Sequence, residues 1–230
     1  RALAVCQSYG GHGGNSLDPL RPDGRCMFLT IAGNIGSGKS SLTSLLHERF
    51  SWQPFFESVD DNPYLADFYG DMRRWSFHLQ VYFLSQRFIT HRDITSSVRD
   101  VVQDRSIYED AEIFAKNLHS IGRMDDRDYA NYRALFDSMT SYLRAPDLMV
   151  YLRASVDTLL RQITLRGRSY EQGIERSYLE QLNALYEEWI AGYTLGPLLI
   201  IDTDATDFVH DSVQREEILL RITGAIDARS

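Results

Sequence analysis

The most constraining feature of the sequence is the stretch LTIAGNIGSGKSSL at residues 29–42. It fits the pattern G-x-x-x-x-G-K-[S/T], with an apolar run before it and an amphipathic run after it. That order predicts a buried strand, a glycine-rich loop and a helix, whose backbone amides and positive N-terminus face a bound phosphate. Lys39 can then reach the β- and γ-phosphates of ATP, and the Ser40 hydroxyl suits Mg²⁺. The residues expected to bind ATP here are Gly33, Asn34, Ile35, Gly36, Ser37, Gly38, Lys39, Ser40 and Ser41.

The rest of the chain alternates short apolar runs with amphipathic stretches. Strands are expected at 26–32, 52–58, 100–106, 148–154 and 197–203, and helices at 40–50, 73–98, 109–119, 126–144, 155–165, 175–193 and from 212 onward. Such alternation implies an α/β fold, a mainly parallel five-stranded sheet flanked by helices, with its ligand beyond the carboxyl ends of the strands. Residues 25–230 are expected to form one domain, after a Gly- and Pro-bearing leader at 1–24 that is expected to be flexible.

Composition excludes several classes of function. The chain has 24 basic and 32 acidic residues, and a net charge of −8 argues against general nucleic-acid binding. Its two cysteines form no CxxC pair, so neither a zinc site nor a disulfide framework is expected, and a reducing, cytoplasmic compartment is the simplest interpretation. No apolar run reaches the roughly 18 residues of a transmembrane helix, so no membrane partner is expected.

Glu57 ends the second predicted strand, on the ligand side of the sheet. A carboxylate there can accept a proton from a hydroxyl nucleophile. If the acceptor already carried a phosphate, a cation would be expected next to Glu57. The sequence neighbours of Glu57 are instead the uncharged Phe56 and Ser58. This favours a neutral alcohol as the acceptor.

Four further charged residues suit phosphoryl transfer. The third predicted strand ends in VVQDRS, where Asp104 suits Mg²⁺, directly or through water, and Arg105 suits a phosphate or a substrate oxygen. Arg166 and Arg168 lie in a polar RGRS stretch between helices, where a mobile lid could bring them over the transferring phosphoryl group.

Gln80 and Arg87 lie two helical turns apart on one face of the long helix at 73–98. Gln80 could pair with a base edge, and Arg87 could face a base carbonyl or ring nitrogen. The aromatic residues around them suit base stacking, the core or a subunit contact equally well.

Several segments together resemble the deoxyribonucleoside kinases, the family of the deoxycytidine, deoxyguanosine, deoxyadenosine and insect multisubstrate enzymes. The matching segments are GNIGSGKSS, FFES, FY…RRWSFHLQVYFLSQRF, DRSIYEDAEIFAKNL and RGRSYEQGI…YLEQLNALYEEWI, which span roughly 28–208. The resemblance implies a P-loop kinase fold with an arginine-bearing lid, Mg²⁺-ATP as donor, and transfer to the 5′-hydroxyl of a deoxynucleoside in nucleotide salvage.

The resemblance also implies roles for individual residues. Glu57 would be the general base and Arg105 would hold both the 5′-hydroxyl and that carboxylate. Tyr69 and Glu171 would bind the 3′-hydroxyl, while Gln80, Arg87 and Asp110 would read the base. Arg166 and Arg168 would be the lid cations. The segment DTDATDF, with Asp207 and Phe208, would wrap the adenine of the donor.

Some positions depart from the family pattern. Asp104 stands where animal members usually carry Glu, and Gln162 where many members carry another lid arginine, with Arg161 beside it. The segment DDNPY at 60–64, with Arg87 and Asp110, resembles the bacterial purine-preferring branch. Deoxyadenosine is therefore the favoured substrate, with deoxyguanosine and deoxycytidine as alternatives.

Three other functions remain open: a nucleoside monophosphate kinase of the thymidylate type, a non-catalytic structural member of the fold, and a regulatory P-loop ATPase.

The helices near 74–95 and 175–193 carry apolar residues over wide arcs, which predicts burial on more than one side. A homodimer through a helix bundle is expected, as the resemblance also implies. The arcs comprise Trp75, Leu79, Tyr82 and Phe83 on one helix, and Leu182, Leu185, Tyr186 and Trp189 on the other.

Overall fold

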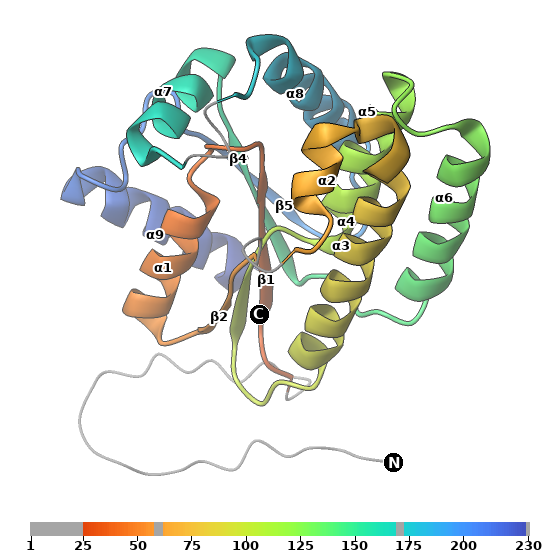
Figure 1. Cartoon of the computed structure of the whole chain (residues 1–230). Helices are drawn as coiled ribbons and strands as arrows, with labels where there is room; N and C mark the ends of the chain where they lie inside the picture. The colour runs from red at the N-terminus through yellow and green to blue at the C-terminus, as the bar shows by residue number, and fades with distance from the viewer. Residues whose placement is uncertain (1–24, 58–61, 169–172, 229–230) are drawn as a thin grey trace, which may run out of the picture.

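The computed structural model describes residues 25–57, 62–168 and 173–228. At its centre is the predicted five-stranded parallel sheet (Figure 1). In order across the sheet, the strands are β2 (Gln53–Phe55), β3 (Val101–Asp104), β1 (Phe28–Gly33), β4 (Leu148–Arg153) and β5 (Leu198–Asp202). Every residue of β1 is buried, because this strand lies in the middle of the sheet and helices cover both faces.

Helices α1 (Lys39–Phe50) and α9 (Ser212–Asp227) cover one face of the sheet. Alternation along β1 places Leu29 and Ile31 in the same apolar cluster as Leu42 and Leu46 of α1. The other face packs against α3 (Met72–Thr95), η1 (Asp110–Ala115) and α8 (Arg176–Ala191). The short helices α4 (Ile107–Glu109) and α5 (Lys116–Ser120) lie directly before and after η1 in the chain. Three further helices complete the described structure: α2 (Leu65–Gly70) before α3, α6 (Asp126–Thr140) outside α3, and α7 (Val156–Arg166) against α8.

The structure corrects the sequence-based boundaries at several points. The second strand pairs only over Gln53–Phe55, at the edge of the sheet and with β3 alone, so Glu57 lies just beyond the strand and not within it as expected. Helix α2 was not predicted, because six residues give too little periodicity to detect. The helix expected at 109–119 contains a π-helical segment, Asp110–Ala115, and such segments occur most often at functional sites.

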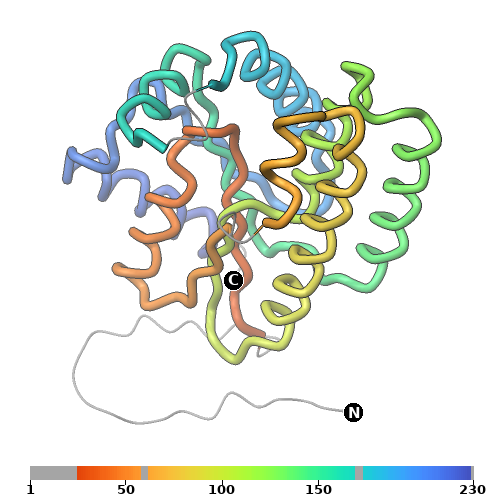
Figure 2. The backbone as a smooth tube through the Cα atoms, viewed as in Figure 1, coloured from red at the N-terminus to blue at the C-terminus, as the bar shows by residue number. Residues whose placement is uncertain are grey.

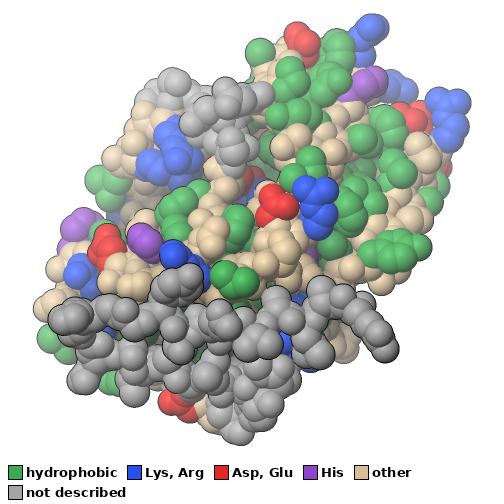
Figure 3. All heavy atoms as spheres, turned by 90° about the horizontal axis from the view of Figure 1, so that it is seen from below, with side chains coloured by type: hydrophobic (Ala, Val, Ile, Leu, Met, Phe, Trp, Pro, Cys, Tyr) green, Lys and Arg blue, Asp and Glu red, His purple; other side chains and the backbone are tan. Residues whose placement is uncertain are grey.

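The carboxyl ends of the strands lie at the top of Figure 1, near α2, α7 and α8. The backbone trace in Figure 2 shows the turn after β1 close to the start of α8, although these segments are far apart in the sequence. Seen from below, the visible part of the opposite end shows acidic, basic and hydrophobic side chains interspersed (Figure 3). Within the described residues, no helix combines the length and hydropathy that a membrane span requires.

Candidate active site

The glycine-rich segment forms the predicted loop between β1 and α1. Gly38 caps α1 at φ 95°, a left-handed conformation that a side chain would strain, and a Cβ there would lie 3.0 Å from Phe208 Cζ. Gly36 is equally restricted, because a Cβ on it would come within 2.9 Å of the carbonyl oxygen of Leu159. The loop is therefore packed closely against both α7 and the segment after β5.

Lys39 is buried beneath this loop, and its Nζ donates to the carbonyl oxygen of Asn34 at 2.9 Å. Burial, followed by the nearby positive charge of Arg105, lowers the pKa of Lys39 to about 8. An anion bound at the loop would favour the charged ammonium and raise this pKa again. Lys39 therefore suits binding of a polyphosphate.

Ser40 and Asp104 come together as expected for a metal site, since Ser40 Oγ donates to Asp104 Oδ2 at 2.5 Å. The other carboxylate oxygen, Asp104 Oδ1, is buried and has no hydrogen-bond partner among the described residues. Those residues contain no cluster of three or more His, Cys, Asp or Glu side chains able to hold a metal by themselves. The pair therefore fits Mg²⁺ that takes its other ligands from phosphate oxygens and water.

Glu57 lies between two arginines. Arg87 Nη2 donates to Glu57 Oε1 at 2.5 Å, and Arg105 Nε donates to Glu57 Oε2 at 3.1 Å. The premise that no cation lies beside Glu57 holds only along the sequence, because the fold brings two arginines to it from distant segments. Arg87 also donates from Nε to Asp110 Oδ2 at 2.9 Å, which joins the four side chains into one buried network.

This network separates the pKa values of its two carboxylates. Burial alone would raise the pKa of Glu57, but Arg105 and Arg87 outweigh it and lower the pKa to about 2. Burial dominates at Asp110 and raises its pKa to about 6, against the opposing charge of Arg87. Glu57 is consequently ionised at neutral pH, with its two oxygens held in a defined orientation.

A cavity of about 320 Å³ opens above this network, and both Lys39 and Glu57 line it. Tyr69, Gln80, Arg105 and Asp110 line it as well. The Gln80 side chain is buried, and its Oε1 has no hydrogen-bond partner among the described residues. This oxygen can therefore accept a hydrogen bond from a bound ligand. The predicted phosphate and acceptor sides of the site thus share one cavity.

The two arginines predicted to belong to a lid also line this cavity. Arg166 is the last residue of α7, Arg168 follows the left-handed Gly167, and both line the cavity. Arg161 does not belong to the described lining, and its Nη2 donates instead to Thr158 Oγ1 at 3.1 Å.

The remaining predicted residues lie apart from the described lining. Arg87 is buried behind Glu57 and Asp110. Phe208 is buried against Gly38, and Asp207 is exposed and accepts a hydrogen bond from the backbone N–H of His210. Glu171 and the two aspartates that begin the DDNPY segment lie outside the described residues.

Sequence reasoning missed several residues of the cavity wall. Phe114 lies in the π-helical segment, and the Arg105 guanidinium carbon lies 4.5 Å from the centre of its ring. Tyr178 of α8 also lines the cavity, and burial raises the pKa of its hydroxyl to about 12, so it remains a donor. Arg105 itself has φ 69°, a left-handed conformation that is rare outside glycine and occurs more often at functional sites. Phe114 follows Asp110 by four residues, and this helical spacing was the signal in the sequence that could have placed Phe114 at the site.

The model of the deoxynucleoside kinase family matches residues 29–227 of the chain. The chain belongs to this family. It is 42% identical over 200 residues to the deoxyadenosine/deoxycytidine kinase of Bacillus subtilis (strain 168), covering 86% of this chain and 92% of that one. It is 39% identical over 203 residues to the deoxyguanosine kinase of Lactobacillus acidophilus, covering 84% and 88% of the two chains. A solved structure of deoxyadenosine kinase from M. mycoides with bound dATP has a TM-score of 0.75 at 28% identity, and covers 86% of this chain and 100% of that one.

The chain is therefore a deoxynucleoside kinase, an ATP-dependent transferase that phosphorylates deoxynucleosides. Family membership and the intact loop favour this activity over the monophosphate-kinase, structural and ATPase alternatives. The recognition of the family and the five-stranded α/β fold are both confirmed.

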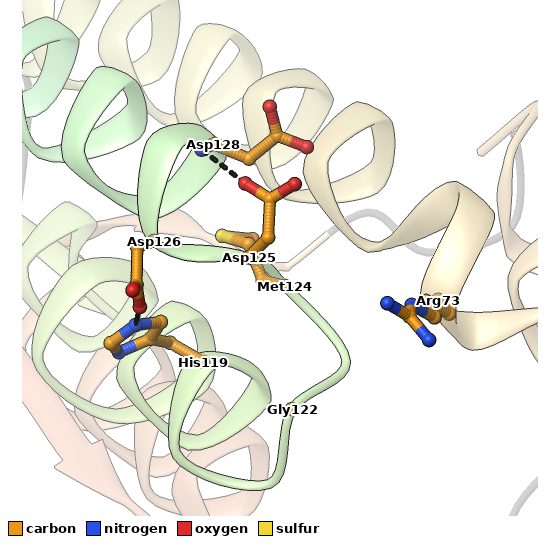
Figure 4. A pocket seen from close by; sticks show the side chains of 7 residues that line it. All are labelled: Arg73, His119, Gly122, Met124, Asp125, Asp126 and Asp128. Atoms are coloured by element: carbon orange, nitrogen blue, oxygen red, sulfur yellow. Dashed lines mark hydrogen bonds and ion pairs between the residues drawn. The ribbon is translucent and has the colours of Figure 1, made fainter.

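This kinase has a second hollow, of about 330 Å³, near the start of α6 (Figure 4). Asp125 caps α6 by accepting from the Asp128 backbone N–H, and His119 contacts Asp126 at 2.8 Å, while Arg73 faces the hollow from α3. Its lining includes neither the glycine-rich loop nor Glu57. Helix capping and the contact with His119 thus account for Asp125 and Asp126, and the cavity beside Lys39 remains the candidate active site.

Proposed function

We propose that Glu57 is the general base that accepts the proton of a deoxynucleoside 5′-hydroxyl, while Lys39 and the arginines hold the γ-phosphoryl group. The observation that carries this proposal is that Glu57 and Lys39 line one cavity at the carboxyl ends of the strands. Phosphoryl transfer needs the nucleophile in line with the phosphate and positive charge around the spreading negative charge, and the cavity can supply both.

Each charged side chain has a place in this scheme. The ionised Glu57 would orient the hydroxyl, and Arg105, already bonded to Glu57, would keep the hydroxyl next to that carboxylate. Arg166 and Arg168, which line the cavity, would close over the donor as lid cations. Ser40 and Asp104 would hold Mg²⁺, which neutralises charge on the β- and γ-phosphates when it is bound.

The base would bind between Gln80 and Asp110, with Phe114 beside it. Gln80 offers a donor and an unpaired acceptor, as a purine edge requires. Asp110 can accept from an exocyclic amine when it is ionised. Deoxyadenosine is the favoured acceptor, in agreement with the relative named deoxyadenosine/deoxycytidine kinase. The relative named deoxyguanosine kinase keeps deoxyguanosine as the alternative acceptor.

The direct experiment is an acceptor screen of the four deoxynucleosides with Mg²⁺-ATP, in which deoxyadenosine should have the highest kcat/KM. Deoxyadenosine monophosphate serves as the matched acceptor that already carries a phosphate, and it should not be phosphorylated. Preference for the monophosphate would contradict the role given to Glu57.

A cytoplasmic homodimer remains part of the proposal. The structure accounts for much of the apolar breadth of α8 within one chain, because Leu182 and Tyr186 are buried against the sheet. Ile89 on α3 and Leu135 on the neighbouring α6 remain exposed at 41% and 38%, and they are available to a second copy. A monomeric mass by light scattering at micromolar concentration would contradict the dimer.

A further inference from the structure

Helix α8 contacts the first two residues of the glycine-rich loop. Leu179, Asn183 and Tyr186 recur at positions i, i+4 and i+7, so they lie on one face of the helix. Each makes a hydrogen bond to Gly33 or Asn34. The residues that α8 and the loop bring into contact are about 150 residues apart in the sequence. The motif of the glycine-rich loop therefore gives no indication of these contacts.

Tyr186 is fully buried, and its hydroxyl lies at the junction of three groups. The oxygen is 2.8 Å from the Gly33 carbonyl oxygen and 2.8 Å from Glu109 Oε1, and it accepts from Arg105 Nη1 at 3.4 Å. Burial, and then the charge of Glu109, raise the pKa of Tyr186 far above its ordinary value. The hydroxyl therefore keeps its single proton and shares it between the loop carbonyl and the glutamate.

Glu109 completes this junction, and it is also fully buried. Its Oε1 accepts from the Gly33 N–H at 3.2 Å, and its Oε2 accepts from the Ser106 N–H at 2.7 Å. One carboxylate thus bonds both to the start of the phosphate loop and to the residue next to Arg105. The proposed mechanism gives Glu109 no chemical step, although a buried carboxylate is retained only with strong partners.

Asn183 makes the second connection. Its Oδ1 accepts from Asn34 Nδ2 at 2.6 Å, and its Nδ2 donates to the Ala154 carbonyl oxygen at 2.9 Å. The Asn34 carbonyl oxygen in turn accepts from Lys39 Nζ at 2.9 Å. Asn34 therefore links α8 to the lysine beneath the loop, through one hydrogen bond of its side chain and one of its backbone carbonyl.

We propose that Tyr186, Glu109 and Asn183 are positioning residues that set the phosphate loop relative to Arg105. Transfer depends on holding the γ-phosphate within about 0.5 Å of its productive position relative to the acceptor, and these residues join the donor loop to the acceptor side. The inference rests on the proposed placement of the donor phosphates at Lys39. It predicts that loss of these contacts affects the donor and the transfer step more than deoxynucleoside binding.

The test compares Tyr186→Phe with Tyr151→Phe. Tyr151 is a matched control, because it is 2% exposed, its ring stacks on that of Tyr186 at 5.7 Å, and its hydroxyl bonds to Glu187 outside the cavity lining. Both variants lose one buried hydroxyl. Tyr186→Phe should lower kcat about tenfold and raise the KM for ATP, with the Kd for deoxyadenosine within about twofold of wild type. Tyr151→Phe should leave all three within about twofold.

A purely structural role predicts a different pattern, in which the active fraction falls while KM and Kd stay constant. Unchanged kcat in Tyr186→Phe, or an equal loss in both variants, would overturn the inference. Asn183→Ala provides an independent arm at a half-buried position that tolerates truncation better. Asn183→Ala should raise the KM for ATP about tenfold without altering the Kd for deoxyadenosine. An unchanged KM for ATP would contradict the inference, and this result can be obtained even if Tyr186→Phe does not fold.

The variant Lys39→Ala distinguishes a wrong donor site from a wrong positioning role of α8. If Lys39→Ala retains ATP-dependent turnover, the proposed donor site is wrong, and the inference about α8 fails with it. If Lys39→Ala is inactive while Tyr186→Phe and Asn183→Ala behave as wild type, only the positioning role is wrong.

Discussion

Replacement of Glu57 by Gln tests the centre of the site, because this carboxylate is bonded to two buried arginines and also faces the cavity. Its side chain is 25% exposed, while those of Arg87 and Arg105 are 8% and 5% exposed. A glutamine keeps the shape but removes the charge, and its amide group turns a donor toward one of the guanidinium groups. The variant should therefore lose both stability and turnover.

The magnitude of the stability loss follows from the pKa of Glu57. Its lowering from an ordinary 4.5 to about 2 corresponds to about 3 kcal/mol of net stabilisation of the carboxylate by its surroundings. That stabilisation is fully present above pH 4.5 and is lost as the pH falls toward 2. The difference in free energy of unfolding between wild type and Glu57→Gln should therefore be about 3 kcal/mol at pH 7 and shrink below pH 4.5.

Turnover should fall by about 100-fold or more, since the variant has no base for the 5′-hydroxyl, whereas the Kd for the deoxynucleoside should change far less. Urea unfolding at several pH values and a coupled ADP-release assay measure the two effects. Glu187→Gln is the control, because Glu187 is 47% exposed and pairs with Arg153 away from the cavity lining. It should cost less than about 1 kcal/mol and leave turnover unchanged. A stable and active Glu57→Gln enzyme would refute the reasoning.

Three further substitutions test separate parts of the site. Lys39→Ala should abolish turnover and weaken ATP binding, while calorimetry should show deoxynucleoside binding retained, because the ammonium group lies on the donor side alone. Asp104→Asn should raise the Mg²⁺ concentration for half-maximal activity about tenfold, and an unchanged Mg²⁺ titration would place the metal elsewhere. The pKa of Asp110 is about 6, so its pairing with Arg87 weakens as the pH falls through 6. Wild-type kcat/KM for deoxyadenosine should fall between pH 7 and 5, and Asp110→Asn should lack that inflection, since the amide does not titrate in this range.

The fold was predictable where local pattern carries the information. The parallel sheet and most of the helices follow from apolar runs that alternate with helical periodicity, and β1 is confirmed because its burial is continuous. The short α2 and the π-helical Asp110–Ala115 were not predictable, since neither produces a distinct periodic signal. Burial of Tyr186 was expected from the wide apolar arc of its helix, but its hydrogen bond to Gly33 of the phosphate loop was not predictable from that pattern.

The sequence by itself determined the phosphate loop, because the glycines, Lys39 and Ser40 act within one strand–turn–helix unit and their spacing sets the local geometry. It also identified Glu57 as a carboxylate at a strand end. Only the tertiary structure decided which charges meet that carboxylate. Arg87 and Arg105 reach it from 30 and 48 residues away, and Tyr186 reaches Gly33 from 153 residues away. Contacts of this kind depend on how strands and helices pack, and packing distances are not encoded in any local pattern of residues.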